Sequence, residues 1–443
     1  MFRRLLFFIC WILILGSFLC SCLSFSQKRR PLVEEVSRGE YEKAFATYKK
    51  LAKRKPTLID LMDQGLILNL LKKHEESNEI FEEAERKIEE LVTKSLSREF
   101  GTYLVNDLTQ AYSGEEFERI YVHIMMAFNY LALGKLESAL VEVRKIDHEL
   151  QVYSDYYQGK NTFKDYAFAH YLSGLIHEAG GEFNDAFISY RKAYYSYEEY
   201  SGYFGIEIPE SLKTDLLYTS LDLGFYEEYE KFSQKFSMKM SKEDVKKRRQ
   251  SKEIILFVAL GKVAHKVERY WGIDTAGGTV LKIAYPEFVP TPYVVHNVKR
   301  DQQRHYLESF LVDDVSAVAI RTLQDRISFI KAKAIARALA KASASTAAGI
   351  AVAKETNSPG WGYLTAFFTN LLLSYTERAD TRSWLTLPEQ IRLFRITVDP
   401  SDNEKSFWLS FLDESGETIY GERLLLPLSQ SKKSFFFIRS KEP

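Results

Sequence analysis

The spacing of hydrophobic residues differs between two parts of the chain. Over residues 31–240, apolar residues recur every three to four positions, which is typical of one face of an α-helix. They come in successive pairs of segments, and in the clearest pair Gly134 separates the two. Glycine there allows the positive φ of a tight turn between helices. Further pairs begin at Leu58 and Ala167, and a more degraded pair turns at Gly224. The pattern predicts an all-α array of helical hairpins.

Small residues at matching offsets in these pairs resemble those of tetratricopeptide repeats. Each such hairpin leaves one apolar face uncovered, and the next hairpin covers it. An irregular α-helical bundle of the same helices is the alternative. Gly39 to Pro56 fits the second half of a unit whose first helix is truncated. The units at Leu58 and Ile120 start farther apart than one repeat of about 34 residues, so residues 92–119 should form an insertion on one face of the array.

Beyond residue 253 the pattern changes to short apolar or alternating runs bounded by glycine, proline and charged residues, which is typical of β-strands. The expected strands are 253–260, 279–285, 392–398, 406–412, 418–426 and 434–439. Ser415-Gly416 predicts a hairpin turn. Together they predict an α+β domain over residues 253–443, built on one antiparallel sheet or a small sandwich and separable from the helical array.

An alanine-rich segment interrupts these strands. It predicts a helix over 313–354, a break at 357–360 and a return helix over 363–379, which together make a helical hairpin. Basic residues interrupt the first helix and its uncharged part is shorter than a membrane span, which favours two helices packed against the sheet over a membrane-inserting hairpin. The charged run 242–252 before the first strand is expected to be a solvated linker, with contact to anionic headgroups as the alternative.

The amino terminus has the layout of a lipoprotein signal peptide. Two arginines precede an apolar run that is short for a spanning helix of about 20 residues. Leu19-Cys20-Ser21-Cys22 looks like a bacterial lipobox, in which an aliphatic residue and two small residues precede the lipidated cysteine. We expect a signal peptide over 1–21, a diacylglyceryl group on Cys22 and a lipid-anchored linker over 22–30. An uncleaved signal anchor is the alternative.

Composition and charge narrow the function. The 60 basic and 60 acidic residues give a formal net charge of zero, whereas nucleic-acid binding needs a basic surplus. All three cysteines lie in the first 22 residues, so the rest of the chain has no disulfide and no cysteine metal site. Phosphate-binding and serine-hydrolase motifs are absent. His170, His177 and Glu178 could make half of a metal site, although such histidines usually pack or face solvent. We therefore expect no enzyme, no cofactor and no metal.

Four stretches together resemble a family of uncharacterised bacterial envelope lipoproteins with tetratricopeptide-like amino-terminal halves. The stretches are Leu104-Val105-Asn106-Asp107 with Tyr112, Gly114, Glu118 and Arg119; Gly261–Glu268; Ile283–Pro286; and Ala379–Pro388. The last is the most specific, because it combines Asp, Arg, Trp and Pro in ten residues. The chain departs from the family pattern at Lys145, where a second arginine is expected. The family has no assigned activity, so the resemblance implies a lipid-anchored envelope protein and no more.

Two polar groups in these stretches are candidate sites. Asp380 and Arg382 could be a catalytic pair, but we expect a structural clasp in which the arginine forks onto a carboxylate and Trp384 is buried between helix and sheet. The second group is Asn106, Asp107, Tyr112, Glu118 and Arg119. Asparagine and aspartate often cap a helix or hold a turn, and a ligand-contacting loop is the alternative.

The concave face of the array is the candidate surface for a protein partner, because repeat proteins generally bind through the face lined by their first helices. By helix position the face includes Met62, Asp63, Tyr121, Met125, Phe128, Phe168, Tyr171 and Glu178. Aromatic residues with methionine suit an apolar peptide or helix. Alternatively, several of them form the core between repeats.

These features predict a lipid-anchored periplasmic scaffold that binds a protein partner in the cell envelope through its repeats and serves envelope assembly or maintenance. Leu23 rather than Asp follows Cys22, which gives no signal for retention in the inner membrane and favours the outer membrane. One alternative is a cell-wall or polysaccharide enzyme that uses Asp380, Glu118 or Glu268 as an acid/base carboxylate. The other is a small-ligand carrier with a deep apolar cavity in the α+β half.

Overall fold

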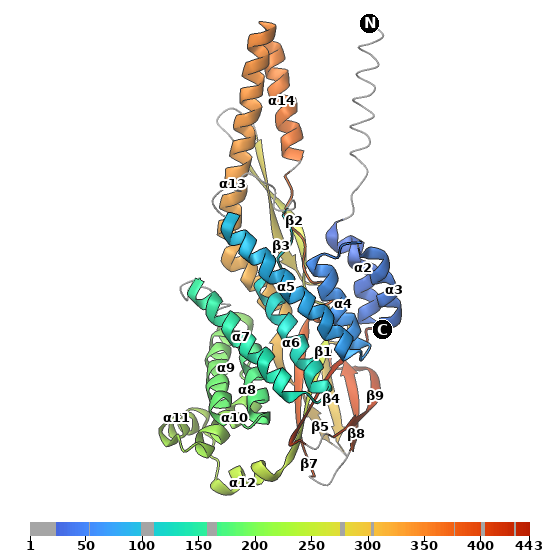
Figure 1. The fold of residues 1–443 in the computed structure, drawn as a ribbon, viewed down its shortest axis with the longest axis vertical. Helices are drawn as coiled ribbons and strands as arrows, with labels where there is room; N and C mark the ends of the chain where they lie inside the picture. The colour runs from blue at the N-terminus through green and yellow to red at the C-terminus, as the bar shows by residue number, and fades with distance from the viewer. Residues whose placement is uncertain are drawn as a thin grey trace.

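The amino-terminal half is a run of antiparallel helical hairpins (Figure 1). The computed structural model describes residues 24–52, 54–98, 110–156, 166–274, 280–302, 305–375, 377–399, 404–428 and 431–443. The helices of the hairpins are α2 (Phe25–Ser37), α3 (Tyr41–Leu51), α4 (Leu58–Leu70), α5 (His74–Arg98), α6 (Glu116–Ala132), α7 (Leu136–Tyr156), α8 (Ala167–Ala179), α9 (Phe183–Phe204), α10 (Glu210–Asp222) and α11 (Tyr226–Phe236). The hairpins predicted from periodicity are therefore present.

Close contacts between the two helices recur at equivalent positions. Gly174 of α8 lies so near the ring of Tyr190 in α9 that a Cβ atom there would be 2.4 Å from the ring. Gly65 in α4 has the same relation to Phe81 in α5, at 2.6 Å. The turn glycines adopt positive φ, 69° at Gly134 for example, which residues with a Cβ rarely tolerate. A small residue opposite a large one thus sets the close spacing of each hairpin.

The two ends of the array differ from expectation. α2 begins at Phe25 and is a complete helix of 13 residues, so the first hairpin is not truncated and the expected linker over 22–30 is helical from Phe25 onward. The charged run after the last hairpin is also a helix, α12 (Lys242–Gln250), rather than a solvated linker. Ser241 caps it, because its side chain accepts a hydrogen bond from the amide of Asp244 while Asp244 bonds back to Ser241.

The strands form two four-stranded sheets and a two-stranded ribbon. They are β1 (Lys252–Leu260), β2 (His265–Asp274), β3 (Val280–Val289), β4 (Asn297–Gln302), β5 (His305–Glu308), β6 (Phe310–Asp314), β7 (Gln390–Val398), β8 (Glu404–Leu412), β9 (Thr418–Pro427) and β10 (Lys433–Arg439). One sheet has the order β10-β1-β7-β6, the other β5-β4-β8-β9, and β2 pairs with β3. The expected purely antiparallel sheet is wrong at one edge, because β10 lies parallel to β1.

The first sheet lies between the helical array and the second sheet. In β1, Ile255 and Phe257 point to the array, whereas Ile254, Leu256 and Val258 point to the second sheet. Side chains alternate along a strand, so a strand covered on both faces must be apolar throughout. The core that contains Phe257 also runs through the helices from α4 to α11. The predicted division into separable domains therefore does not describe this packing: the two halves share one core.

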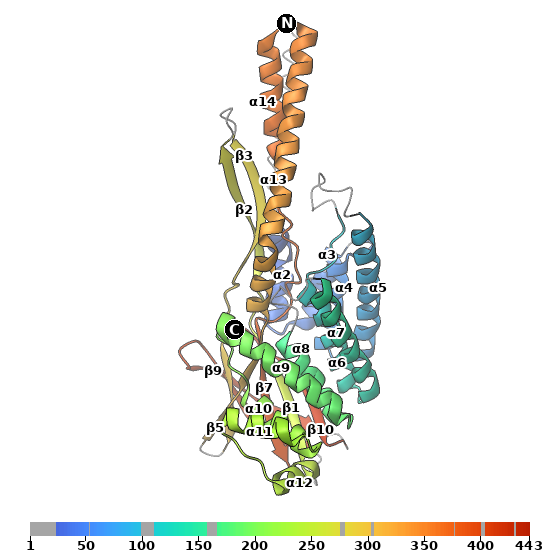
Figure 2. The same ribbon diagram turned by 90° about the vertical axis from the view of Figure 1, so that its left-hand side faces the viewer.

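A long helical hairpin projects from this body (Figures 1 and 2). It consists of α13 (Val315–Thr356) and α14 (Pro359–Tyr375). The lower part of α13 packs on β3, where Ala334 and Ala338 surround Ile283. The upper part extends beyond the sheets, so the expected packing against a sheet holds only at the base. In the part of the chain that the structure describes, no helix has both the length and the apolar character needed to cross a membrane.

Candidate functional site

The face of the array that was predicted to bind a partner is covered by the chain's own sheet. None of its residues is more than 7% exposed: Met62, Asp63, Tyr121, Met125, Phe128, Phe168, Tyr171 and Glu178. Phe257 of β1 fills its centre, with ring centroids 5.1 Å from Phe128 and 5.9 Å from Phe168. Phe437 of β10 stacks on Phe128 at 4.8 Å. The apolar character of this face is therefore explained by burial within the molecule.

The polar residues of that face also bond across to the other half. Tyr121 and Tyr166 both donate hydrogen bonds to the Asp313 carboxylate at the end of β6. Burial raises the pKa of Asp313 to about 7, although the two hydroxyl donors oppose the shift. Asp63 pairs with Arg29 and accepts a hydrogen bond from the Thr386 hydroxyl at 2.7 Å. These contacts hold the array to the sheet.

A cavity of about 880 Å³ lies where α8, α10 and α12 meet β1, β7 and β10. Four acidic and six basic residues line it: Glu178, Asp215, Asp244, Glu253, Lys247, Arg248, Arg249, Arg395, Lys432 and Lys433. Arg395 binds Asp215 at 2.5 Å and Glu253 at 2.7 Å, and Lys433 joins Glu253 at 2.7 Å. Arg248 of α12 reaches Asp215 at 2.6 Å.

Six of these charged residues form one network of ion pairs: Glu178, Asp215, Glu253, Arg248, Arg395 and Lys433. Glu178 is buried, which opposes ionisation, but the cations of Arg248 and Lys433 outweigh this effect and lower its pKa to about 2. A small-ligand carrier would require an apolar cavity inside the α+β half. The cavity instead has a charged lining and lies at the boundary with the array. The sequence analysis placed Glu178 on the concave face and Arg248 in the charged run 242–252, but it did not bring the two together, since ion pairing between distant segments leaves no local pattern.

Two groups that the sequence treated separately meet in one place, which we call the Glu118 junction (Tyr112, Glu115, Glu118, Lys266 and Trp384). The Glu118 carboxylate accepts hydrogen bonds from the backbone amide of Trp384 at 2.6 Å and from the Tyr112 hydroxyl at 2.6 Å. It also accepts one from the amide of Glu115 at 3.0 Å. Burial and the neighbouring Glu115 carboxylate raise the pKa of Glu118 to about 7. Lys266 from β2 pairs with Glu115.

The residues of the predicted clasp border this junction. Arg382 forks onto Asp380, with nitrogen–oxygen distances of 2.8 and 2.7 Å, and donates to the Gln110 carbonyl at 3.0 Å. Trp384 is 1% exposed and its ring lies 6.1 Å from that of Phe81 in the array. Arg119 holds the turn before α6 by bonding the carbonyl oxygens of Ser113 and Gly114. Asn106, Asp107 and Cys22 lie outside the described residues.

The three candidate catalytic carboxylates already take part in hydrogen bonds within the molecule. Glu118 is completely buried and its two oxygens already accept three hydrogen bonds. Glu268 accepts the amide of Ala379 at 2.6 Å, and Asp380 is occupied by Arg382. General acid/base chemistry needs a carboxylate within hydrogen-bond reach of a bound substrate. Glu118 and Glu268 join segments that are far apart in the sequence, and Asp380 binds Arg382 two residues away.

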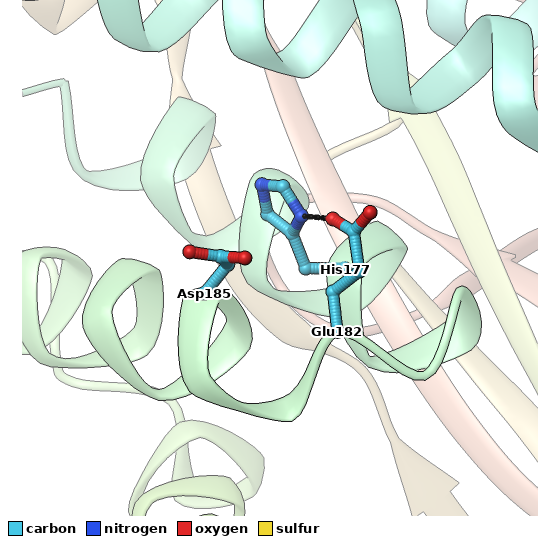
Figure 3. A group of neighbouring side chains, drawn as sticks. All are labelled: His177, Glu182 and Asp185. Atoms are coloured by element: carbon cyan, nitrogen blue, oxygen red, sulfur yellow. Dashed lines mark hydrogen bonds and ion pairs between the residues drawn. The ribbon is translucent and has the colours of Figure 1, made fainter.

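One cluster has the residue types of a metal site (Figure 3). The ligand atoms of His177, Glu182 and Asp185 lie within 4.8 Å of one another at the turn between α8 and α9. Glu182 is already engaged by His177 at 2.7 Å and by Arg144 at 2.5 Å. His170 approaches Asp147 at 3.3 Å, so the imagined group of His170, His177 and Glu178 does not assemble. Two of its three residues, His177 and Glu182, are therefore already paired with each other.

The projecting hairpin carries a group of exposed apolar side chains. α14 exposes Trp361 (62%), Tyr363 (78%), Leu364 (45%), Phe367 (56%) and Phe368 (56%). Monomeric proteins rarely expose several large apolar side chains together unless the patch binds something. We call these five residues the α14 face. The sequence predicted this segment as a helix. It could not show which side of the helix would be buried, because that depended on how far the sheet extends along the hairpin.

Comparison with known proteins adds little. No protein-family model and no curated protein matches the chain. Two solved structures of MamA, AMB-1 and MSR-1, are each 12% identical, cover 49% and 50% of this chain and 93% and 96% of their own, and have TM-scores of 0.29 and 0.28. BtubC from P. vanneervenii is 12% identical over 47% of this chain and 77% of its own, with a TM-score of 0.31. TM-scores of this size do not establish a shared fold.

Proposed function

We propose that the protein is a lipid-anchored, non-enzymatic scaffold of the bacterial cell envelope that uses its projecting hairpin to hold another envelope component. The single observation that carries this proposal is the α14 face, which exposes five large apolar side chains on a helix that extends beyond the body. The concave face of the array, which the sequence favoured for a partner, is filled by β1 and β10. The hairpin is therefore the better candidate for the contact surface.

The base of the hairpin is held by buried ion pairs. Glu377, which follows α14, is 2% exposed and pairs with Lys341 at 2.5 Å and Arg337 at 3.4 Å on α13. Breaking a buried pair leaves an uncompensated charge and is costly. The ion pairs thus hold the segment after α14 against α13. The ion pair of Lys266 with Glu115 in the Glu118 junction joins the neighbouring β2–β3 ribbon to the array.

The lipid anchor is a separate part of the proposal and is tested separately. Cys22→Ser should leave the precursor unlipidated and abolish incorporation of labelled fatty acid, because the Cys22 sulfur is the proposed site of the diglyceride. Cys20→Ser is the matched control and should be nearly silent, since Phe18 and Leu19 would make a poor lipobox for it. Fatty acid that still enters the Cys22→Ser protein would disprove the assignment.

The contact surface is tested in cells. A photoreactive amino acid at Leu364 should form crosslinked products, whereas the same residue at exposed Glu227 on α11 should not. Phe367→Glu with Phe368→Glu should abolish these products without lowering protein abundance, since both side chains already face solvent. Tyr226→Glu, which changes an equally exposed aromatic residue on α11, is the matched control. Unaltered envelope function in the double variant, with no crosslinks from residue 364, would overturn the proposal.

A further inference from the structure

We propose that the component held by the α14 face is an anionic lipid bilayer, with α14 lying along its surface and the aromatic side chains inserted between the headgroups. This inference rests on the proposed function, because it names what the projecting hairpin contacts. Three features of the hairpin carry it: the distribution of large and small residues, the geometry of the α14 face, and the local charge.

The hairpin has small residues between its two helices and large apolar side chains on its outer surface. A Cβ atom on Gly362 would lie 2.5 Å from that of Ala353, and one on Gly349 would lie 2.7 Å from that of Ala366. Small residues therefore make the contact between α13 and α14, and larger side chains would not fit there. Close packing through small residues is how helices associate in lipid, where large apolar side chains gain nothing by turning inward. Helix pairs in water normally place their large apolar residues between them.

The α14 face forms one continuous strip. Trp361, Leu364 and Phe368 follow each other at helical spacing, and Tyr363 and Phe367 lie on the adjacent row, so all five fall within about 160° of the helix circumference. α14 contains no charged residue. Helices that lie in a membrane surface carry tryptophan, phenylalanine and leucine on the side that enters the lipid. Tryptophan and tyrosine favour the depth at which headgroups meet acyl chains.

The hairpin concentrates positive charge in a chain that is neutral overall. Residues 329–378 contain six basic residues (Lys331, Lys333, Arg337, Lys341, Lys354 and Arg378) and two acidic ones (Glu355 and Glu377), which leaves four positive charges. The rest of the chain therefore carries four negative charges, because the total is zero. Arg337 and Lys341 are engaged by Glu377 at the base of the hairpin, so the attraction to anionic headgroups comes from the other basic residues, each contributing about 1 kcal/mol near the surface. This asymmetry favours lipid over a neutral protein groove.

A lipid anchor at Cys22 would strengthen the contact further. It would hold the hairpin at a high effective concentration next to the same bilayer, so even a weak intrinsic affinity would keep the face occupied. The upper half of α13 presents mainly alanine, serine and threonine to solvent beside the strip, which is compatible with a helix pair lying flat rather than spanning.

The test uses the lipidated protein reconstituted in vesicles of phosphatidylethanolamine and phosphatidylglycerol. Every native cysteine lies at or before residue 22, so Leu364→Cys provides a single site for an environment-sensitive fluorophore. We expect a blue shift of its emission and quenching by lipids that carry a nitroxide on the acyl chain. Glu227→Cys on α11 is the matched control and should show neither effect.

Two variants make the result specific. Phe367→Glu with Phe368→Glu should remove most of the quenching at residue 364, because each charged side chain lowers the partition of the helix into lipid by about tenfold or more. Tyr226→Glu should leave it unchanged. Replacing phosphatidylglycerol with phosphatidylcholine, or adding salt, should weaken it, since the attraction of the basic residues is screened.

The outcomes separate this inference from the proposed function. Unshifted, unquenched emission at residue 364 in both kinds of vesicle overturns the lipid assignment. If crosslinking in cells then joins residue 364 to a protein, the scaffold proposal stands with a protein in place of the bilayer. If no crosslink forms and the double glutamate variant functions normally, both proposals fail.

Discussion

Replacing Phe257 with alanine should destabilise the helical array as much as the sheet in which the residue lies. Phe257 is fully buried on the central strand β1, and its ring contacts Phe128 on α6 and Phe168 on α8. The substitution removes the side chain at the centre of the contact between the two halves and leaves a cavity there. Its effect therefore reports whether the halves unfold together.

The magnitude follows from the size of the lost side chain. A buried Phe→Ala change costs about 3–5 kcal/mol, which includes the loss of two aromatic pairs worth about 0.5–1.5 kcal/mol each. If all 443 residues unfold as one unit, the unfolding entropy is roughly 0.9 kcal/mol/K and Tm should fall by about 3–5 °C. If residues 253–443 unfolded alone, the same loss would lower their Tm by about 8–12 °C and leave the array unchanged.

Calorimetry and hydrogen exchange distinguish these cases. Exchange of the most protected amides in α6 and in β1 should accelerate by the same factor, about a hundredfold to several thousandfold, because each 1.4 kcal/mol is a factor of ten. Tyr226→Ala, which removes an exposed ring on α11, should change neither quantity measurably. Two separate thermal transitions, with full protection retained in α6 of the Phe257→Ala protein, would refute the shared core.

Three further predictions follow from buried contacts. Trp384→Ala should cost about 3–5 kcal/mol and lower protein abundance, and Arg382→Ala should destabilise less, both read from urea denaturation; unchanged midpoints would contradict a clasp. Gly174→Leu should lower the free energy of unfolding by at least about 1–3 kcal/mol, because the leucine side chain would overlap the Tyr190 ring. The stability of the Gly174→Ala protein should lie between that of the unsubstituted protein and that of the Gly174→Leu protein. For His123, burial lowers the pKa, but hydrogen bonds with Glu142 and Glu149 outweigh this and raise it to about 9. The stability it contributes is complete below its unfolded pKa of about 6.5 and is lost as pH rises through 9, so His123→Gln should flatten the fall in urea midpoint between those values.

The helical hairpins and most strands could be derived from the sequence because their signals are local. The pairing of Gly174 with Tyr190 repeats that of Gly65 with Phe81 at the same separation, and this spacing is visible without coordinates. β1 was recognisable because a strand buried on both faces is apolar at every position. β2 escaped prediction because the charged residues Lys266, Glu268 and Arg269 leave no apolar run in the strand.

Which surface covers which could be decided only by the tertiary structure. The sequence marked Phe128 and Phe168 as members of an apolar face, but the residue that buries them, Phe257, is more than 80 positions away. The hydrophobic effect is not directional, so an apolar face specifies burial without specifying its partner. The same reasoning applies to Glu118, whose hydrogen bond with Trp384 joins residues 266 positions apart. Local periodicity thus determined the elements, and long-range packing determined that the array's inner face is closed and the α14 face is open.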